Sequence, residues 1–146
     1  MKKRAQVSVR LLSFCLLVCA PLVTLADVYV IVNAGNSTKS MNADQVERLF
    51  LRKSKRFENG DGADPVNQKD GSKARTVFND KILRRSDQQL KYYWARKMFS
   101  GGDKPPPVVY NGEDVEDFVA GRPGGIGYLL RPPTLKDVKV VLRVKN

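Results

Sequence analysis

Apolar residues along the chain follow two different periods, which predict strands and helices in turn. Residues 27–33, DVYVIVN, alternate and are rich in β-branched side chains, so they predict a strand, and their apolar run indicates burial on both faces. Residues 65–68, 126–130 and 138–144 predict further strands, and residues 108–111, VVYN, predict a brief extended segment. Strands are therefore expected along the whole chain and not in one block.

Helical periodicity fills the intervals between these strands. Four helices are predicted, over about 43–52, from near Ser72 onward, over about 87–99 and over about 113–120. Asn42 and Gln45 form a capping-box pattern before the first helix, and Ser86 caps the third. The residues expected to face the core are Val46, Leu49, Phe50, Val77, Phe78, Ile82, Leu90, Tyr93, Trp94, Met98, Val115, Phe118 and Val119.

The alternation of strands and helices predicts the fold class. Strands interspersed with helices at this spacing favour an α/β domain with a mixed sheet flanked by helices. Residues 27–146 number 120, which suits a single compact domain with one core and is too few for two lobes.

The first 26 residues read as a signal peptide. Lys2, Lys3 and Arg4 precede the apolar run 11–20, and Thr24-Leu25-Ala26 offers small residues for cleavage before residue 27. A retained anchor is the alternative, but the run is shorter than the roughly 20 residues that a spanning helix needs. The pattern predicts a periplasmic or secreted protein, with residues 27–146 as the mature domain and no transmembrane segment after cleavage.

Composition removes several kinds of chemistry. Both cysteines, Cys15 and Cys19, lie in the leader, and there is no histidine, so disulfides, zinc sites and histidine-based catalysis are not expected. Lipidation at Cys19 is an open alternative, although LLVC lacks the usual small residue before the cysteine. No nucleophile has a base beside it, so neither an enzyme nor a cofactor is expected.

The mature domain is basic, since its 22 Lys and Arg exceed its 15 Asp and Glu by seven. Such a charge attracts anions, acidic partners or a lipid surface. No aromatic-basic motif for stacking bases is present, so nucleic acid is not an expected partner.

The turn KDGSKA at residues 69–74 is the main candidate site. Gly71 makes the turn, and Ser72 could cap the following helix or direct its hydroxyl outward. The N–H groups of Lys73 to Arg75 would then attract an oxyanion at the helix start, aided by the charges of Lys73 and Arg75. A plain helix cap is the alternative, and it is the commoner use of such residues.

A second candidate is the loop NSTKS after the first strand, in which Ser37 and Thr38 supply hydroxyl donors. It would meet the Ser72 turn if the strands ran parallel; otherwise it is a solvated loop.

Three other segments are assigned structural roles. The glycines of RPGGIG allow a sharp turn and close packing, and the basic loop of Lys53, Lys55 and Arg56 is solvated surface. The acidic residues Glu113, Asp114, Glu116 and Asp117 spread over the exposed face of a short helix.

Four segments in a fixed order carry a family resemblance: ERLFLRKSKRFENGD, DGSKARTVF, YYWARKMFSGG and PGGIGYL. Over about residues 28–130 the chain resembles the substrate-binding proteins of phosphate ABC transporters, specifically small relatives with one lobe of a type 2 periplasmic-binding-protein fold. The family loop Arg-Ser-Asp-Gly-Ser-Gly-Thr matches here at Asp70, Gly71 and Ser72. The positions of its Arg, second Gly and Thr hold Gln68, Lys73 and Ala74.

The resemblance implies a non-enzymatic periplasmic binding module that holds phosphate or a similar oxyanion. Ser72, Lys73, Gly71 and Arg75, with Ser37 and Thr38, are then the ligand-binding residues. One lobe leaves such a site open to water, so tight capture would need a partner chain or a homodimer. The alternative is a ligand-free interaction or regulatory protein of the cell envelope that docks an acidic partner through its basic surface.

Overall fold

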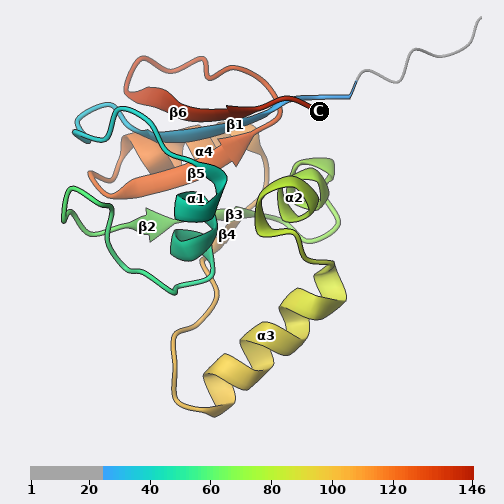
Figure 1. Cartoon of the computed structure of the whole chain (residues 1–146). Helices are drawn as coiled ribbons and strands as arrows, with labels where there is room; N and C mark the ends of the chain where they lie inside the picture. The colour runs from blue at the N-terminus through green and yellow to red at the C-terminus, as the bar shows by residue number, and fades with distance from the viewer. Residues whose placement is uncertain (1–24) are drawn as a thin grey trace, which may run out of the picture.

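The computed structural model describes residues 25–146, in which helices lie against a central sheet (Figure 1). The signal-peptide prediction falls almost wholly outside the described residues, as do both cysteines. Within residues 25–146 no helix is long and apolar enough to cross a membrane.

The central sheet is mixed, in the strand order β2-β5-β1-β6. Strand β1 (Val28–Asn33) runs antiparallel to both β5 (Gly125–Leu129) and β6 (Val138–Val144), whereas β2 (Asp64–Pro65) runs parallel to β5. A second, two-stranded sheet joins β3 (Asn67–Gln68) to β4 (Val108–Val109) in parallel. The predicted strand 65–68 is therefore two short strands on either side of Val66, each paired in a different sheet.

Three of the four helices begin where the predicted capping residues place them. Helix α1 (Ala43–Phe50) has the capping box of Asn42 and Gln45, and α3 (Asp87–Phe99) is capped by Ser86. Helix α2 (Lys73–Phe78) continues as a π-helical turn, η1 (Asn79–Leu83), and α4 (Gly112–Ala120) follows the cap Asn111. The prediction for the first helix was two residues too long at its C-terminal end.

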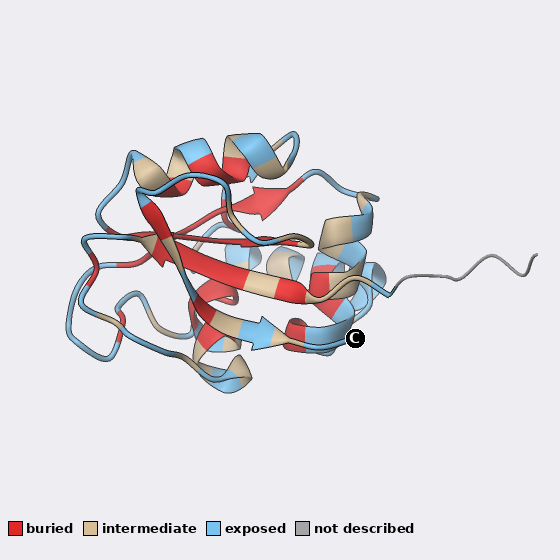
Figure 2. Cartoon of the chain, turned by 90° about the horizontal axis from the view of Figure 1, so that it is seen from above, coloured by how far each residue is buried: buried red, intermediate tan, exposed pale blue. Residues whose placement is uncertain are grey.

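Both faces of the sheet are covered, which confirms the α/β prediction (Figure 2). Val28, Val30 and Val32 of β1 contribute to the core on the side of α1, α2 and η1, whereas Ile31 contributes to the core under α4. Alternation of this kind buries a strand on both sides, as its apolar run indicated. Among the largest buried side chains are Tyr128, Phe50, Phe78, Ile31, Leu51 and Ile82.

Glycines let α4 pack closely on β5, as predicted for RPGGIG. A Cβ on Gly127 would lie 2.5 Å from Val115 Cγ1, and one on Gly125 would lie 2.8 Å from Val119 Cα. Neither distance leaves room for a methyl group.

Helix α3 differs from its prediction. Of its residues only Leu90 is buried; Tyr93 and Trp94 are half-buried, and Met98, expected to face the core, is 48 % exposed. The helix projects from the body at the end farthest from β6 (Figure 1), so most of its surface has no core to cover.

Candidate functional site

A hollow of about 230 Å³ lies where β3 and β5 end and where α2 and α4 begin. Its lining residues are Gln68, Ala74, Gly112, Glu113, Leu129, Leu130 and Arg131. Ala74 and Gly112 belong to the first turns of α2 and α4, and helix starts carry partial positive charge. The two helix starts favour a small anion at this hollow, whereas the Glu113 carboxylate in the lining opposes one.

Ser72 caps α2 in the structure. Its Oγ accepts a hydrogen bond of 3.3 Å from Arg75 N, and Gly71 before it has φ +76°, the left-handed region that favours glycine. Capping uses Oγ as an acceptor only, so the hydroxyl hydrogen is still available for a ligand. In residues 25–146 the amides of Lys73 and Ala74 have no hydrogen-bond acceptor. The cap and anion interpretations of this turn are therefore compatible.

Arg75 braces the turn and does not face solvent. Its Nη1 donates to Gln68 O at 3.0 Å and lies 2.9 Å from Asp70 Oδ1, and its side chain is only 14 % exposed. The guanidinium thus holds the end of β3 against the turn. Lys73 is exposed and forms no ion pair with the described residues. Of the two cations predicted here, Lys73 alone is open to a ligand.

Gln68 fastens the same turn to the central sheet. Its backbone N donates to Tyr128 Oη at 3.1 Å, and its Nε2 donates to Tyr128 O at 2.8 Å. Tyr128 Oη also donates to Asn67 Oδ1 at 3.3 Å, and its ring stacks on Phe78 with centroids 3.9 Å apart. Burial raises the pKa of the Tyr128 phenol, so the hydroxyl stays protonated. Gln68 therefore has a structural role in holding the turn to the central sheet.

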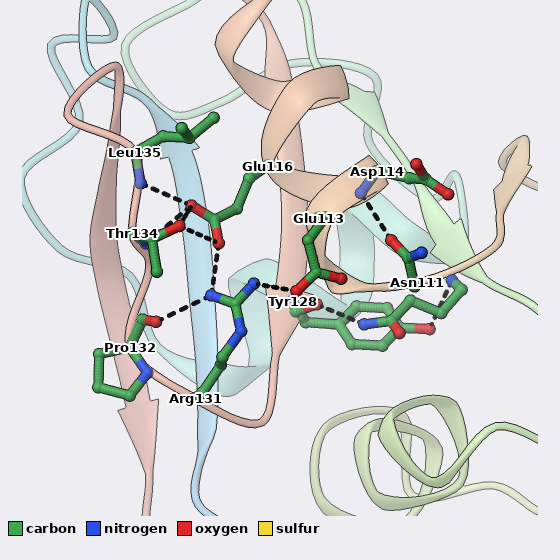
Figure 3. Close-up of polar contacts among 10 residues, drawn as sticks. Asn111, Glu113, Asp114, Glu116, Tyr128, Arg131, Pro132, Thr134 and Leu135 are labelled. Carbon is green, nitrogen blue, oxygen red and sulfur yellow. Dashed lines mark hydrogen bonds and ion pairs between the residues drawn. The ribbon is translucent and has the colours of Figure 1, made fainter.

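Arg131, which sequence analysis missed, brings a cation to the hollow. It lies just after β5 between two carboxylates of α4: its Nη2 donates to Glu113 Oε1 at 3.0 Å, and its Nη1 donates to Glu116 (Figure 3). The Arg131 side chain is 36 % exposed. Nothing local in LLRPP marks this arginine, because its partners lie 15 and 18 residues away.

Glu116 is buried, which corrects the prediction that the acidic cluster lies on the exposed face of its helix. The side chain is 1 % exposed and accepts backbone hydrogen bonds of 2.8 Å from both Thr134 N and Leu135 N (Figure 3). Burial raises its pKa, but the bonds from Leu135, Arg131 and Thr134 outweigh that effect, and the pKa is lowered overall. Glu116 therefore stays ionised and fixes Arg131 at the hollow.

Ser37 and Thr38 do not meet the Ser72 turn. Because β1 is antiparallel to β5, the loop after Asn33 leaves the sheet at the edge where β5 begins, opposite the hollow. There Ser37 Oγ accepts from Asn59 Nδ2 at 2.7 Å, and Thr38 N donates to Asn36 Oδ1 at 2.8 Å. The condition of parallel strands fails, so the two predicted half-sites are separate.

The other charged segments are largely engaged in ion pairs. In the basic loop, Lys53 pairs with Glu47 at 3.0 Å and Lys55 with Asp103 at 2.9 Å. Over residues 25–146 no group of three acidic side chains is arranged to hold a metal ion.

Solved structures with a similar fold are known for this chain, although sequence comparisons find no relative. No protein-family profile and no curated protein match the chain. A candidate phosphate ABC transporter substrate-binding protein with bound phosphate from Clostridium perfringens is similar in structure at 16 % identity, with a TM-score of 0.63 over 80 % of this chain and 45 % of that one. An ABC-type phosphate transport receptor from Vibrio cholerae is similar at 13 % identity, with a TM-score of 0.62 over 80 % of this chain and 46 % of that one. A candidate phosphate-binding protein from Planctomyces limnophilus is similar at 14 % identity, with a TM-score of 0.51 over 71 % of this chain and 36 % of that one.

These similarities define the class of fold. The described chain is a mixed α/β domain with the fold of part of the phosphate-transporter substrate-binding proteins, which confirms the fold expected from the four sequence segments. It spans less than half the length of those solved structures. At 13–16 % identity the similarity establishes architecture and not ligand.

Proposed function

We propose that the chain is a periplasmic, non-enzymatic solute-binding module that holds a small oxyanion, with phosphate as the first candidate, in the hollow between α2 and α4. The observation that carries this proposal is the meeting of two helix starts at a single hollow, with the unpaired Lys73 next in sequence to the lining residue Ala74. Arg131 at the same hollow is neutralised by Glu113 and Glu116 and adds no net positive charge. The bound phosphate named for the Clostridium perfringens protein supports the choice of ligand.

In this proposal the ligand-binding groups come chiefly from the Ser72 turn. Ser72 donates its hydroxyl hydrogen, the amides of Lys73 and Ala74 donate to the anion, and the Lys73 ammonium adds charge. Gly71 supplies the turn, and Arg75 acts through its brace to Gln68 and Asp70. Ser37 and Thr38, at the opposite edge, have no part in this site.

The expected affinity is modest, because water reaches the site. Exposed charged contacts contribute less than about 1 kcal/mol each. A few of them support a dissociation constant of about 1 mM, which corresponds to about 4 kcal/mol. Tight capture then requires a second chain over the hollow, either a homodimer or an envelope partner.

Calorimetric titration of residues 27–146 with phosphate and sulfate tests the proposal. The variant Ala74→Asp puts a carboxylate into the hollow at a position where an acidic residue favours a helix start. Ala43→Asp is its matched control, since Ala43 is also half-buried in a first turn but lies on α1. We expect Ala74→Asp to weaken binding at least about tenfold, or about 1.4 kcal/mol, and Ala43→Asp to leave it unchanged.

Absence of heat at millimolar phosphate and sulfate, with folding verified by circular dichroism, would contradict the proposal. The alternative would then stand: a ligand-free interaction or regulatory protein of the cell envelope. Two observations favour that alternative, because each leaves the Ser72 turn with fewer groups for an anion. Gln68 replaces the arginine of the family loop, and Arg75 is already engaged by Asp70 and Gln68.

A further inference from the structure

Helix α3 contacts the body along one side only. Leu90 is buried on that side, Tyr93 Oη donates to Leu51 O at 2.6 Å, and Lys97 Nζ donates to Leu51 O and Arg52 O at 2.9 Å each. These contacts tie the helix to the end of α1. They leave its opposite side facing away from the rest of the domain (Figure 1).

The free side carries an apolar stripe. Tyr92, Ala95 and Phe99, here called the outer stripe, follow one another at intervals of three and four residues and therefore share one helix face. Tyr92 is 67 % exposed and Phe99 is 96 % exposed, and Met98 beside Phe99 is 48 % exposed. A helix with apolar residues on two faces needs two surfaces to cover them, and this domain supplies one.

Two cations border the outer stripe. Lys91 lies on one side of it and Arg96 on the other, and neither forms an ion pair with any residue in the described part of the chain. The third cation of the helix, Lys97, points inward to the carbonyls of Leu51 and Arg52, just after α1. Exposed aromatic side chains suit the headgroup layer of a bilayer, and unpaired cations beside them suit one that carries anionic lipids.

We propose that the outer stripe of α3 docks on a membrane surface that carries anionic phospholipids. Tyr92 and Phe99 would enter the headgroup layer, where aromatic rings are favoured, and Lys91 and Arg96 would pair with lipid phosphates. The projection of α3 from the body allows a flat surface to reach the stripe. This inference does not depend on an anion at the hollow.

Charge disfavours a second copy of the chain as the occupant. In an antiparallel pair of α3 helices crossing at Ala95, the two Arg96 side chains would face each other. Each copy also carries an excess of seven basic residues over positions 27–146, so long-range repulsion opposes the pairing. An anionic lipid surface would instead attract both Arg96 and the net positive charge of the domain.

Vesicle flotation of residues 27–146, which contain every residue of both core clusters, tests the proposal. The probes are phosphatidylcholine vesicles with and without phosphatidylglycerol. We expect binding only with phosphatidylglycerol. One cation near such a surface contributes about fivefold in affinity, so Lys91→Glu with Arg96→Glu should weaken binding at least about twentyfold. The control pair Lys136→Glu and Lys145→Glu changes net charge equally at exposed sites elsewhere and should have a much smaller effect.

The aromatic contribution is tested separately. Phe99→Ser should weaken binding at least about tenfold. Tyr110→Ser, at an aromatic residue that is 69 % exposed on the chain after β4, should not. Equal losses in test and control variants, or no binding at any composition, would overturn the proposal. A shift from dimer to monomer on Phe99→Ser, seen by sedimentation equilibrium without vesicle binding, would instead assign the stripe to a second copy. Anion titration of the same variants is expected to be unchanged.

Discussion

Replacing Glu116 by glutamine tests the buried ion pair that joins α4 to the segment after β5. Glutamine keeps the size and one acceptor oxygen of glutamate but removes the charge. In the native protein the carboxylate, 1 % exposed, accepts from Arg131 Nη1, Thr134 N and Leu135 N. The amide NH₂ of glutamine would face at least one of these donors, so that donor would lose its acceptor.

The magnitude follows from the bonds that are lost. Hydrogen bonds to a charged group contribute about 1.5–3 kcal/mol each. At least one of the three is lost in the variant, and the others weaken because their acceptor is no longer charged. Arg131 is 36 % exposed, so water can hydrate its guanidinium in the variant and reduce the cost. We therefore expect Glu116→Gln to lower the free energy of unfolding by about 2–4 kcal/mol at neutral pH.

The same pair predicts a pH dependence. The pKa of Glu116 is lowered in the folded protein from an ordinary value of 4.5, so its contribution to stability is fully present above that value. The contribution is lost as the pH falls from 4.5 through the folded-state pKa. The difference in stability between native protein and Glu116→Gln should thus be constant near neutrality and shrink in acid.

Urea unfolding followed by circular dichroism at several pH values measures both effects. Glu113→Gln is the matched control, because Glu113 contacts the same arginine from the same helix but its side chain is 71 % exposed. It should have far less effect on stability. A loss below about 0.5 kcal/mol for Glu116→Gln, which is the usual range for surface substitutions, or a loss that persists undiminished at pH 3, would refute the reasoning.

Two further substitutions test the packing and the cap. Gly127→Ala should destabilise the domain by about 1–3 kcal/mol through overpacking, because its Cβ would lie 2.5 Å from Val115 Cγ1; thermal unfolding measures this, and an unchanged midpoint would contradict the close approach of α4. Ser72→Ala should cost about 1 kcal/mol by removing the acceptor for Arg75 N; in urea, Ser72→Asp should restore the stability, and no recovery would argue against capping.

Elements with local signals could be predicted from the sequence. Capping residues marked the starts of α1 and α3, because the two residues of a capping box are only three positions apart in the sequence. Strand β6 was predicted with its observed bounds, and β1 with its burial on both faces, because alternation is also a local pattern.

Features that depend on remote partners could not be predicted. Residues on either side of Val66 pair with β5 and with β4, more than 40 residues onward, and no pattern within the segment distinguishes the two sheets. The direction of β5 against β1 separated Ser37 from the Ser72 turn for the same reason. Arg131 is held at the hollow by the carboxylate of Glu116, which lies 15 residues away in the sequence.

Helix α3 also needed information from outside its own segment. Its aromatic residues suit a core, and sequence alone gave no sign that Met98 and Phe99 lie beyond the reach of one. Apolar residues predict that a surface will be covered but do not identify the covering element.

The small buried surface of α3 also affects how easily this helix separates from the domain. With Leu90 as its single buried residue, the helix can detach while the central sheet remains intact. Its amide protons should therefore exchange with deuterium sooner than those of β1. Docking of the outer stripe would slow that exchange, so the domain would be held at a lipid surface by a helix that has a single buried residue of its own.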